Sequence, residues 1–198
     1  MNKDELLAEW ARRSKREGVT KVMRQSHPLE VTYAFSIEME REIKDFIHAR
    51  YGSLNGKTVL EIGCGIGRFT SWLASEAKSV TAVDMTAEMI RQAPKLSNVT
   101  YVLGDIATMR VKPHDLAFDV WTLMHIFDDF NVCMQKIAAL CQTAFICEYT
   151  FAGTPVSKYS IIRKPSDYML DGFSQVASQT ITYVDDISTM SLQSKNSR

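Results

Sequence analysis

The chain has 198 residues, of which 45% are hydrophobic and 23% are charged. This length and composition are typical of one globular domain with a sizeable core, which excludes a disordered or low-complexity protein. Its 23 Lys and Arg residues balance 23 Asp and Glu residues, and this neutrality argues against a dedicated nucleic-acid binder. No apolar run is long enough to span a membrane and no signal peptide is recognisable, so we expect a cytoplasmic protein without a membrane partner.

The N-terminal part predicts two helices. Apolar residues at helical spacing indicate a first helix that ends before Gly18, and a second is expected over residues 30–50. Seven basic residues stand against four acidic ones within residues 1–27. We interpret this excess as a solvated helix face, and a site for an anionic partner is the alternative. Residues 1–50 are therefore expected to form a helical lid or extension.

Residues 51–195 are expected to form the main domain, and residues 196–198 a tail. Strands are predicted at 58–63, 79–85, 99–106, 118–126 and 143–151, with helices at 68–77, 86–93 and 130–140. A helix near 166–177 and two closing strands, 180–184 and 188–194, follow, with a turn at Asp185 and Asp186 between the strands. The alternation predicts an α/β fold: a doubly wound, mostly parallel sheet with a terminal antiparallel strand pair.

Three glycines follow the first predicted strand, at Gly63, Gly65 and Gly67. The dinucleotide fingerprint G-x-G-x-x-G would need a further glycine where Arg68 stands, and no Gly-Lys-Ser/Thr follows for a phosphate-binding loop. Glu61 precedes the first glycine by two residues. An acid beside the loop suits a cofactor with a cationic head group better than an anion.

The loop from Glu61 to Gly67 resembles motif I of the class I S-adenosylmethionine-dependent methyltransferases, in their small-molecule branch. The resemblance implies a Rossmann-like sheet, with S-adenosyl-L-methionine as cofactor and S-adenosyl-L-homocysteine as product. It also implies that Asp84 takes the ribose hydroxyls, that Asp105 accepts from the adenine amino group, and that the Ile106 amide reaches the adenine ring. The remaining cofactor-binding candidates are Gly63, Cys64, Gly65, Met85 and Met124.

Structural interpretations remain open for several of these residues. Glu61 either contacts the cofactor or orders the loop, and Met85 either packs on adenine or belongs to the core. Asp84 and Asp105 could serve only as a helix-initiating acid and a turn residue. Cys64 is expected to contribute its backbone and to fill space. All four cysteines of the chain lie in apolar surroundings without metal-ligand spacing, and we expect buried free thiols and no metal site.

His125, after the fourth predicted strand, is the leading catalytic candidate. A histidine there could accept a proton from the acceptor, or it could only shape the pocket. Tyr33 is a second candidate, and Glu148 and Tyr149 are weaker ones. The motifs of amino-directed, cytosine-5 and metal-dependent catechol enzymes are absent.

The resemblance thus implies methyl transfer to an oxygen or nitrogen of a small-molecule acceptor. The alternatives are an RNA or protein methyltransferase that uses the basic N-terminal helix, and a cofactor-binding module without transfer activity. The sequence leaves the oligomeric state open.

Overall fold

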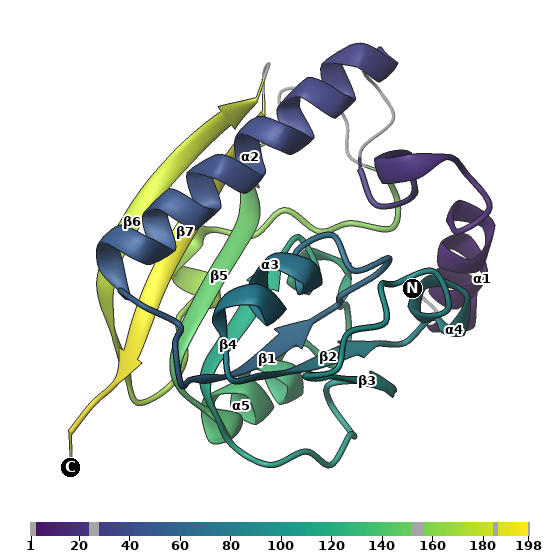
Figure 1. Cartoon of the computed structure of the whole chain (residues 1–198). Coiled ribbons are helices and arrows are strands. Elements are labelled where there is room, and N and C mark those ends of the chain that lie inside the picture. The colour runs from purple at the N-terminus through teal and green to yellow at the C-terminus, as the bar shows by residue number, and fades with distance from the viewer. Residues whose placement is uncertain (1–2, 24–27, 152–156, 184–185, 198) are drawn as a thin grey trace.

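The computed structural model describes residues 3–23, 28–151, 157–183 and 186–197 as one α/β unit (Figure 1). The helices are α1 (Lys3–Arg13), α2 (Leu29–Arg50), α3 (Thr70–Glu76), α4 (Ala87–Ile90) and α5 (Phe130–Leu140), with 3-10 helices η1 (Gly18–Lys21), η2 (Leu123–His125) and η3 (Pro165–Tyr168). The strands are β1 (Thr58–Ile62), β2 (Ser79–Asp84), β3 (Val99–Leu103), β4 (His114–Val120), β5 (Cys141–Phe151), β6 (Phe173–Tyr183) and β7 (Asp186–Lys195). None of these helices is long and apolar enough to cross a bilayer.

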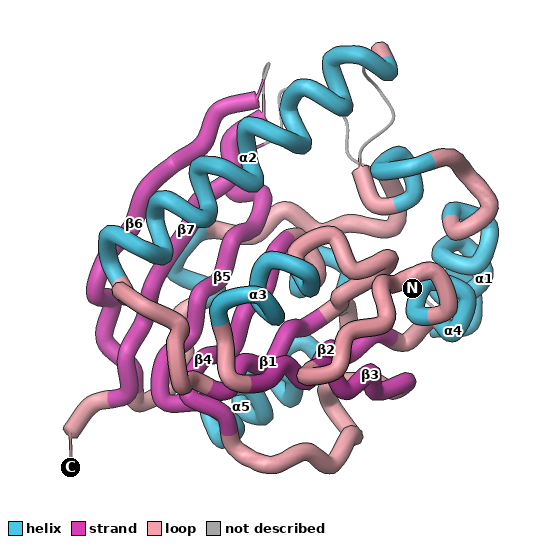
Figure 2. Tube along the Cα trace, in the orientation of Figure 1, coloured by secondary structure: helices cyan, strands magenta, loops and turns pink. Residues whose placement is uncertain are grey.

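All seven strands form one sheet in the order β3-β2-β1-β4-β5-β7-β6 (Figure 2). The strands from β1 to β5 are parallel, and β7 pairs antiparallel with both β5 and β6. The predicted fold class is therefore confirmed. The chain reverses its winding direction between β1 and β4, and a ligand of an open α/β sheet binds at the carboxyl ends of the strands at such a point.

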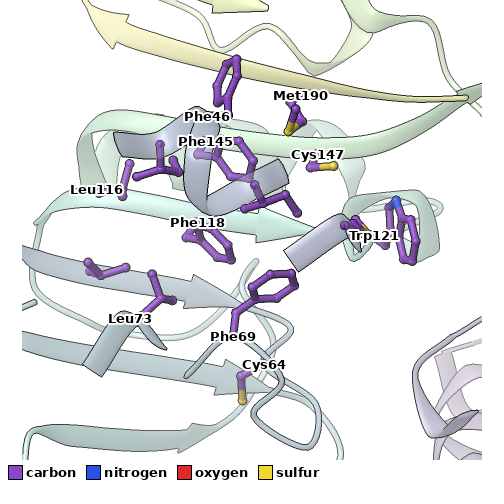
Figure 3. Packing of buried hydrophobic residues seen from close by; sticks show 14 of the residues in the cluster. Phe46, Cys64, Phe69, Leu73, Leu116, Phe118, Trp121, Phe145, Cys147 and Met190 are labelled. Atoms are coloured by element: carbon purple, nitrogen blue, oxygen red, sulfur yellow. The ribbon is translucent and has the colours of Figure 1, made fainter. Parts of the chain in front are cut away.

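One face of the sheet is covered by α2 and α3, which bury a column of aromatic rings (Figure 3). The ring centroids of Phe46 from α2 and Phe145 from β5 lie 5.8 Å apart. Phe145 stacks on Phe118 of β4 at 5.2 Å, and Phe118 meets Phe69 of the loop before α3 at 5.3 Å. This column fixes the helices against the strands directly below the glycine loop.

The opposite face is covered by α5. Its residues Cys133, Ile137 and Leu140 pack against Ala144 and Ile146 of β5. All four cysteines are buried and free, as expected from their apolar surroundings.

The structure differs from several predicted elements: β3 ends at Leu103 and not at 106, β4 begins at His114 and not at 118, and α4 ends at Ile90 and not at 93. β4 ends at Val120 because Trp121 has a φ of 57°, and this left-handed residue turns the chain out of the sheet into η2. The predicted helix near residues 166–177 is wrong: only η3 forms there, and β6 begins at Phe173. Most side chains of β6 are polar and exposed, so this edge strand lacks the alternation by which strands are recognised. Of the predicted turn residues, Asp185 lies outside the described part of the chain.

Candidate functional site

A cavity of about 140 Å³ lies at the carboxyl ends of β1, β2 and β4, at the point where the strand order reverses. Its walls come from the glycine loop, the segments after β2, β3 and β4, and helix α1. Of the predicted site residues it brings together Glu61, Gly63, Cys64, Gly65, Asp84, Met85, Asp105, Ile106 and His125. Residues up to 64 positions apart in the sequence thus share one site.

The glycine loop is tied to the sheet by its backbone. The amide of Cys64 donates to the carbonyl of Val83 on β2 at 2.9 Å, and the amide of Gly67 closes a turn on the carbonyl of Cys64 at 2.9 Å. Gly63 has a φ of 65°, and a Cβ there would lie 2.1 Å from Oγ1 of Thr122. Only glycine satisfies both the left-handed backbone and the close approach of the segment after β4.

Asp84 connects this loop to the end of β2. Its Oδ2 accepts from the amide of Gly65 at 2.8 Å, and its Oδ1 accepts from the amide of Thr86 at 2.8 Å. Burial raises the pKa of this carboxyl from its ordinary value, and the amides of Thr86 and Gly65 act in the opposite direction. A carboxylate has about four acceptor positions, so two remain after these bonds.

Glu61 is 3% exposed, and Oγ1 of Thr70 on α3 donates to its Oε2 at 2.6 Å. Burial raises the pKa of Glu61 to about 8. This carboxyl joins β1 to α3 and also lines the cavity, and its contact with a cofactor stays a prediction. Burial also raises the pKa of the Cys64 thiol, which suits a space-filling residue and not a nucleophile.

The adenine side predicted by the resemblance is closed by α1. Oδ1 of Asp105 accepts from the amide of Ala107 at 2.9 Å, and Oδ2 forms an ion pair with Lys3. This bond to Asp105 raises the pKa of Lys3. In this conformation the lysine occupies the oxygen expected to receive the adenine amino group.

His125 enters the cavity from η2. Its Nδ1 lies 2.7 Å from the carbonyl oxygen of Tyr159, and because a carbonyl only accepts, Nδ1 carries the proton and Nε2 is an acceptor. Burial lowers the pKa of His125 to about 4, with Arg13 acting in the same direction, so the ring is neutral at pH 7. The ring of Trp10 on α1 packs edge-on against it, with centroids 4.9 Å apart.

A polar cluster of Asp119, Glu148 and Arg163, which the sequence did not reveal, packs against η2. Oε1 of Glu148 accepts from the amide of Leu123 at 2.6 Å. Arg163 donates to the carbonyls of Leu123 and Ile126 at 3.2 and 2.6 Å. Asp119 is 1% exposed beside Glu148, and burial together with the neighbouring acid raises its pKa, while burial raises the pKa of Glu148 to about 7. Glu148 and Arg163 thereby position the turn that carries His125.

Three other candidates do not line the cavity. Tyr33 is 36% exposed on α2, and its hydroxyl lies against Gly18. Met124 is buried in the core on the α2 side, although it precedes His125. Tyr149 stacks on Trp121 with centroids 4.7 Å apart. A catalytic role for Tyr33 would require a different position of the N-terminal segment.

Arg68, which stands in place of a further glycine, links the loop to α2. Its side chain is 8% exposed, and it donates from Nε to Oε1 of Glu40 at 3.2 Å and from Nη2 to the carbonyl of Ser36 at 3.3 Å. Its guanidinium also lies over the rings of Phe69 and Trp121, at 4.8 and 5.8 Å from their centroids. The arginine thereby holds α2 against the end of the sheet that carries the cavity.

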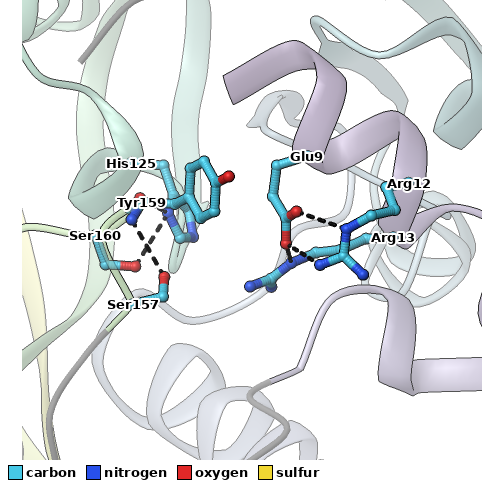
Figure 4. A network of polar contacts seen from close by, with 7 residues as sticks. All are labelled: Glu9, Arg12, Arg13, His125, Ser157, Tyr159 and Ser160. Carbon is cyan, nitrogen blue, oxygen red and sulfur yellow. Dashed lines mark hydrogen bonds and ion pairs between the residues drawn. The ribbon is translucent and has the colours of Figure 1, made fainter. Parts of the chain in front are cut away.

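On the far side of His125, α1 presents an ion-pair network (Figure 4). Glu9, whose side chain is 6% exposed, accepts from Nε and Nη2 of Arg12 at 2.9 and 2.7 Å and from Nε of Arg13 at 2.9 Å. Figure 4 shows this group facing His125, Tyr159 and Ser160, with the Tyr159 hydroxyl directed to the same side. Asp84 thus lines the cavity at the end of β2, whereas the ion-pair network lies outside the lining, beyond Trp10 and His125.

Known proteins that resemble this chain include methyltransferases. A family model described as a methyltransferase domain matches residues 59–143. Phosphoethanolamine N-methyltransferase 1 of Triticum aestivum is 34% identical over 101 residues, which are 46% of this chain and 20% of that protein. The chain thus spans about a fifth of the length of this relative.

Two further proteins align over more of their length. A ubiquinone biosynthesis O-methyltransferase of Actinobacillus pleuropneumoniae is 26% identical over 138 residues, 64% of this chain and 58% of that protein. The solved structure of the N-methyltransferase NodS from Bradyrhizobium japonicum superposes with a TM-score of 0.76 at 14% identity and covers 96% of this chain and 99% of its own. These findings agree with the resemblance carried by the glycine loop and the two acids: residues 59–143 match a methyltransferase domain, and the chain shares the fold of NodS.

Proposed function

We propose that the chain is an S-adenosylmethionine-dependent methyltransferase that acts on an oxygen or nitrogen of a small-molecule acceptor. The observation that carries this proposal is the cavity, in which the glycine loop, Asp84 and the acceptor nitrogen of His125 converge at the switch point of the sheet. The named relatives, which methylate nitrogen or oxygen, support the same class of reaction.

The residues present fit this cofactor. Asp84 keeps two acceptor positions after binding the loop, which is what a ribose cis-diol needs. Glu61 lies next to the first glycine, where it would meet the ammonium group, and Met85 and Ile106 line the side assigned to adenine. We further propose that α1 acts as a lid, since Lys3 must leave Asp105 before an adenine amino group can bind there.

The bound cofactor supplies a methyl group on a sulfonium centre, ready for direct displacement. The protein then has to align the attacking atom and exclude water. His125 does the first by accepting a hydrogen bond at Nε2, because the Tyr159 carbonyl fixes its tautomer. Its low pKa makes it a positioning group and a weak base, which suits an acceptor that loses its proton late. Leu6 and Trp10 of α1 cover the cavity and keep it apolar.

The experiment is isothermal titration calorimetry with S-adenosylmethionine and S-adenosylhomocysteine, followed by a product assay. We expect saturable binding of both, and S-adenosylhomocysteine formation with a panel that includes phosphoethanolamine and catechol-type phenols. Binding without turnover of any acceptor would favour the cofactor-binding module, and no binding of either nucleoside would refute the proposal.

We place the protein in the cytoplasm, with a small molecule and not a nucleic acid as its partner. The support is the zero net charge and the four unpaired buried thiols, which suit a reducing compartment. Cell fractionation with an antibody against the chain tests the location.

A further inference from the structure

The basic end of α1 carries more charge than its surroundings neutralise. Arg12 and Arg13 end α1, and Arg16 follows three residues later in the bend after it. Glu9 is the acid that binds Arg12 and Arg13. One carboxylate against three guanidinium groups leaves an excess of two positive charges. Arg12 is 61% exposed and is screened by water, whereas the side chain of Arg13 is 14% exposed.

Arg16 is the unsatisfied member of this cluster. Its Nη1 is buried and has no hydrogen-bond partner among the residues that the structure describes. Burial lowers the pKa of this guanidinium, and Arg13 and Arg12 lower it further. A buried donor on a charged group is costly when left unpaired, so a missing acceptor is expected at this place.

Arg13 also has donors to spare. Arg13 donates to Glu9 from Nε, and its two terminal nitrogens have no acceptor among the residues that the structure describes. Its guanidinium carbon lies 4.8 Å from the centroid of Trp10, whose ring contacts His125. The charge of Arg13 is close enough to lower the pKa of His125. Arg13 thus lies next to Trp10, which lines the cavity together with His125.

We propose that Arg13 and Arg16 form an anion subsite that binds a phosphate or carboxylate group of the acceptor. That the bound anion belongs to the methyl acceptor rests on the proposed function, whereas the subsite itself is defined by the two arginines. Guanidinium groups bind such oxyanions through paired N–H donors. The two excess charges match a phosphate dianion, and one carboxylate would neutralise half of them. The hydroxyl of Tyr159, directed to the same side in Figure 4, would supply a neutral donor.

One competing occupant is the carboxylate of the cofactor's own amino-acid part. It would be expected beside Glu61 and Gly63, and binding in the presence of S-adenosylhomocysteine separates the two cases. If the arginines hold the cofactor, phosphate and S-adenosylhomocysteine compete; if they hold the acceptor, both bind together.

The test is calorimetric titration of inorganic phosphate, and separately of acetate, into the full chain with and without saturating S-adenosylhomocysteine. The variants are Arg13→Gln and Arg16→Gln, with Lys15→Gln as the matched control, because Lys15 is an exposed cation on the same segment. Constant ionic strength is maintained with chloride. Thermal unfolding is recorded for each variant, and Arg16→Gln is expected to unfold at the wild-type temperature or above, since it removes an unpaired charge.

We expect phosphate or acetate to bind the wild type, about tenfold or more weakly to Arg16→Gln and Arg13→Gln, and unchanged to Lys15→Gln. The stronger of the two anions identifies the head group. Equal weakening in Lys15→Gln, displacement of phosphate by S-adenosylhomocysteine, or no saturable binding of either anion would overturn the subsite. If the anion binds in an arginine-dependent way but S-adenosylhomocysteine does not bind, the subsite is supported and the proposed methyltransferase function is refuted.

Discussion

Replacement of Asp84 by Asn is the most direct test of the cofactor site. The change keeps the size of the side chain but turns one oxygen into an amide donor. Both oxygens of Asp84 are engaged by backbone amides, Oδ2 by Gly65 and Oδ1 by Thr86. An asparagine can serve only one of them, and its NH₂ group then faces an N–H.

The structure offers a matched control in Asp115, at the start of β4 and the opposite end of the sheet. Its Oδ2 alone accepts from both the amide and the Oγ1 of Thr58, each at 2.8 Å, and these bonds lower the pKa of the carboxyl. An asparagine at 115 can keep both bonds and lose only the charge.

A hydrogen bond to a charged group contributes about 1.5–3 kcal/mol and a neutral one about 1 kcal/mol. Asp84→Asn should therefore lower the free energy of unfolding by about 1.5–3 kcal/mol, and Asp115→Asn by about 1 kcal/mol. The loss of one charge-assisted bond to a ribose hydroxyl should weaken S-adenosylhomocysteine binding about 10- to 150-fold in Asp84→Asn. Asp115→Asn should bind it as the wild type does.

Urea unfolding measures the free energies of unfolding of the two variants. Calorimetry at a temperature where both variants are folded measures their affinities for S-adenosylhomocysteine. Unchanged affinity in Asp84→Asn would refute the assignment of the ribose site. Equal loss in the two variants would show that affinity follows general stability and not the contact at Asp84.

Three further changes test separate parts of the site. Because the pKa of Glu61 is raised to about 8, its contribution to stability is fully present below its ordinary value of 4.5 and is lost as the pH rises through 8. Denaturant unfolding at several pH values should show a smaller loss over this window in Glu61→Gln than in the wild type; parallel curves would contradict the assignment. Gly63→Ala should destabilise the protein by about 1–3 kcal/mol more than Gly52→Ala, since both have positive φ but only the first places a Cβ against Thr122. Similar unfolding midpoints for Gly63→Ala and Gly52→Ala would show that the segment after β4 can shift to accommodate the added Cβ. Lys3→Ala removes an ion pair that is 48% exposed at the lysine, and calorimetry should show S-adenosylhomocysteine binding up to about fivefold tighter, because such pairs contribute about 0–1 kcal/mol. Weaker binding would mean that the lysine assists the cofactor.

The parallel half of the fold was predictable because its strands are short apolar runs separated by helix signals. β1 and α5 lie within a residue of their expected ends. Only the last part of the edge strand β6 was predicted, as the strand at 180–184, because the polar, exposed residues before it carry no strand signal. The early end of β4 depends on the left-handed backbone of Trp121, which no local pattern indicates.

The grouping of the residues at the carboxyl edge of the sheet was predictable for a related reason. Gly63 follows β1, Asp84 ends β2 and Asp105 lies two residues after β3, and parallel strands bring their carboxyl ends together. The contacts that hold the backbone of η2 were not predictable, because Glu148 and Arg163 reach it from distant segments of the chain. Arg16 was counted among solvated charges, but its Nη1 is buried in the folded structure.

The link through Arg68 has a consequence for modularity. The glycine loop lies inside the segment that matches the methyltransferase domain, but the groups that hold Arg68, Glu40 and the Ser36 carbonyl, come from α2 outside it. Residues 59–143 excised alone would leave a guanidinium without its partners and the aromatic column without Phe46. The same dependence means that loops exchanged between relatives will need their own α2, so this helix and the loop should be treated as one unit in chimaeras.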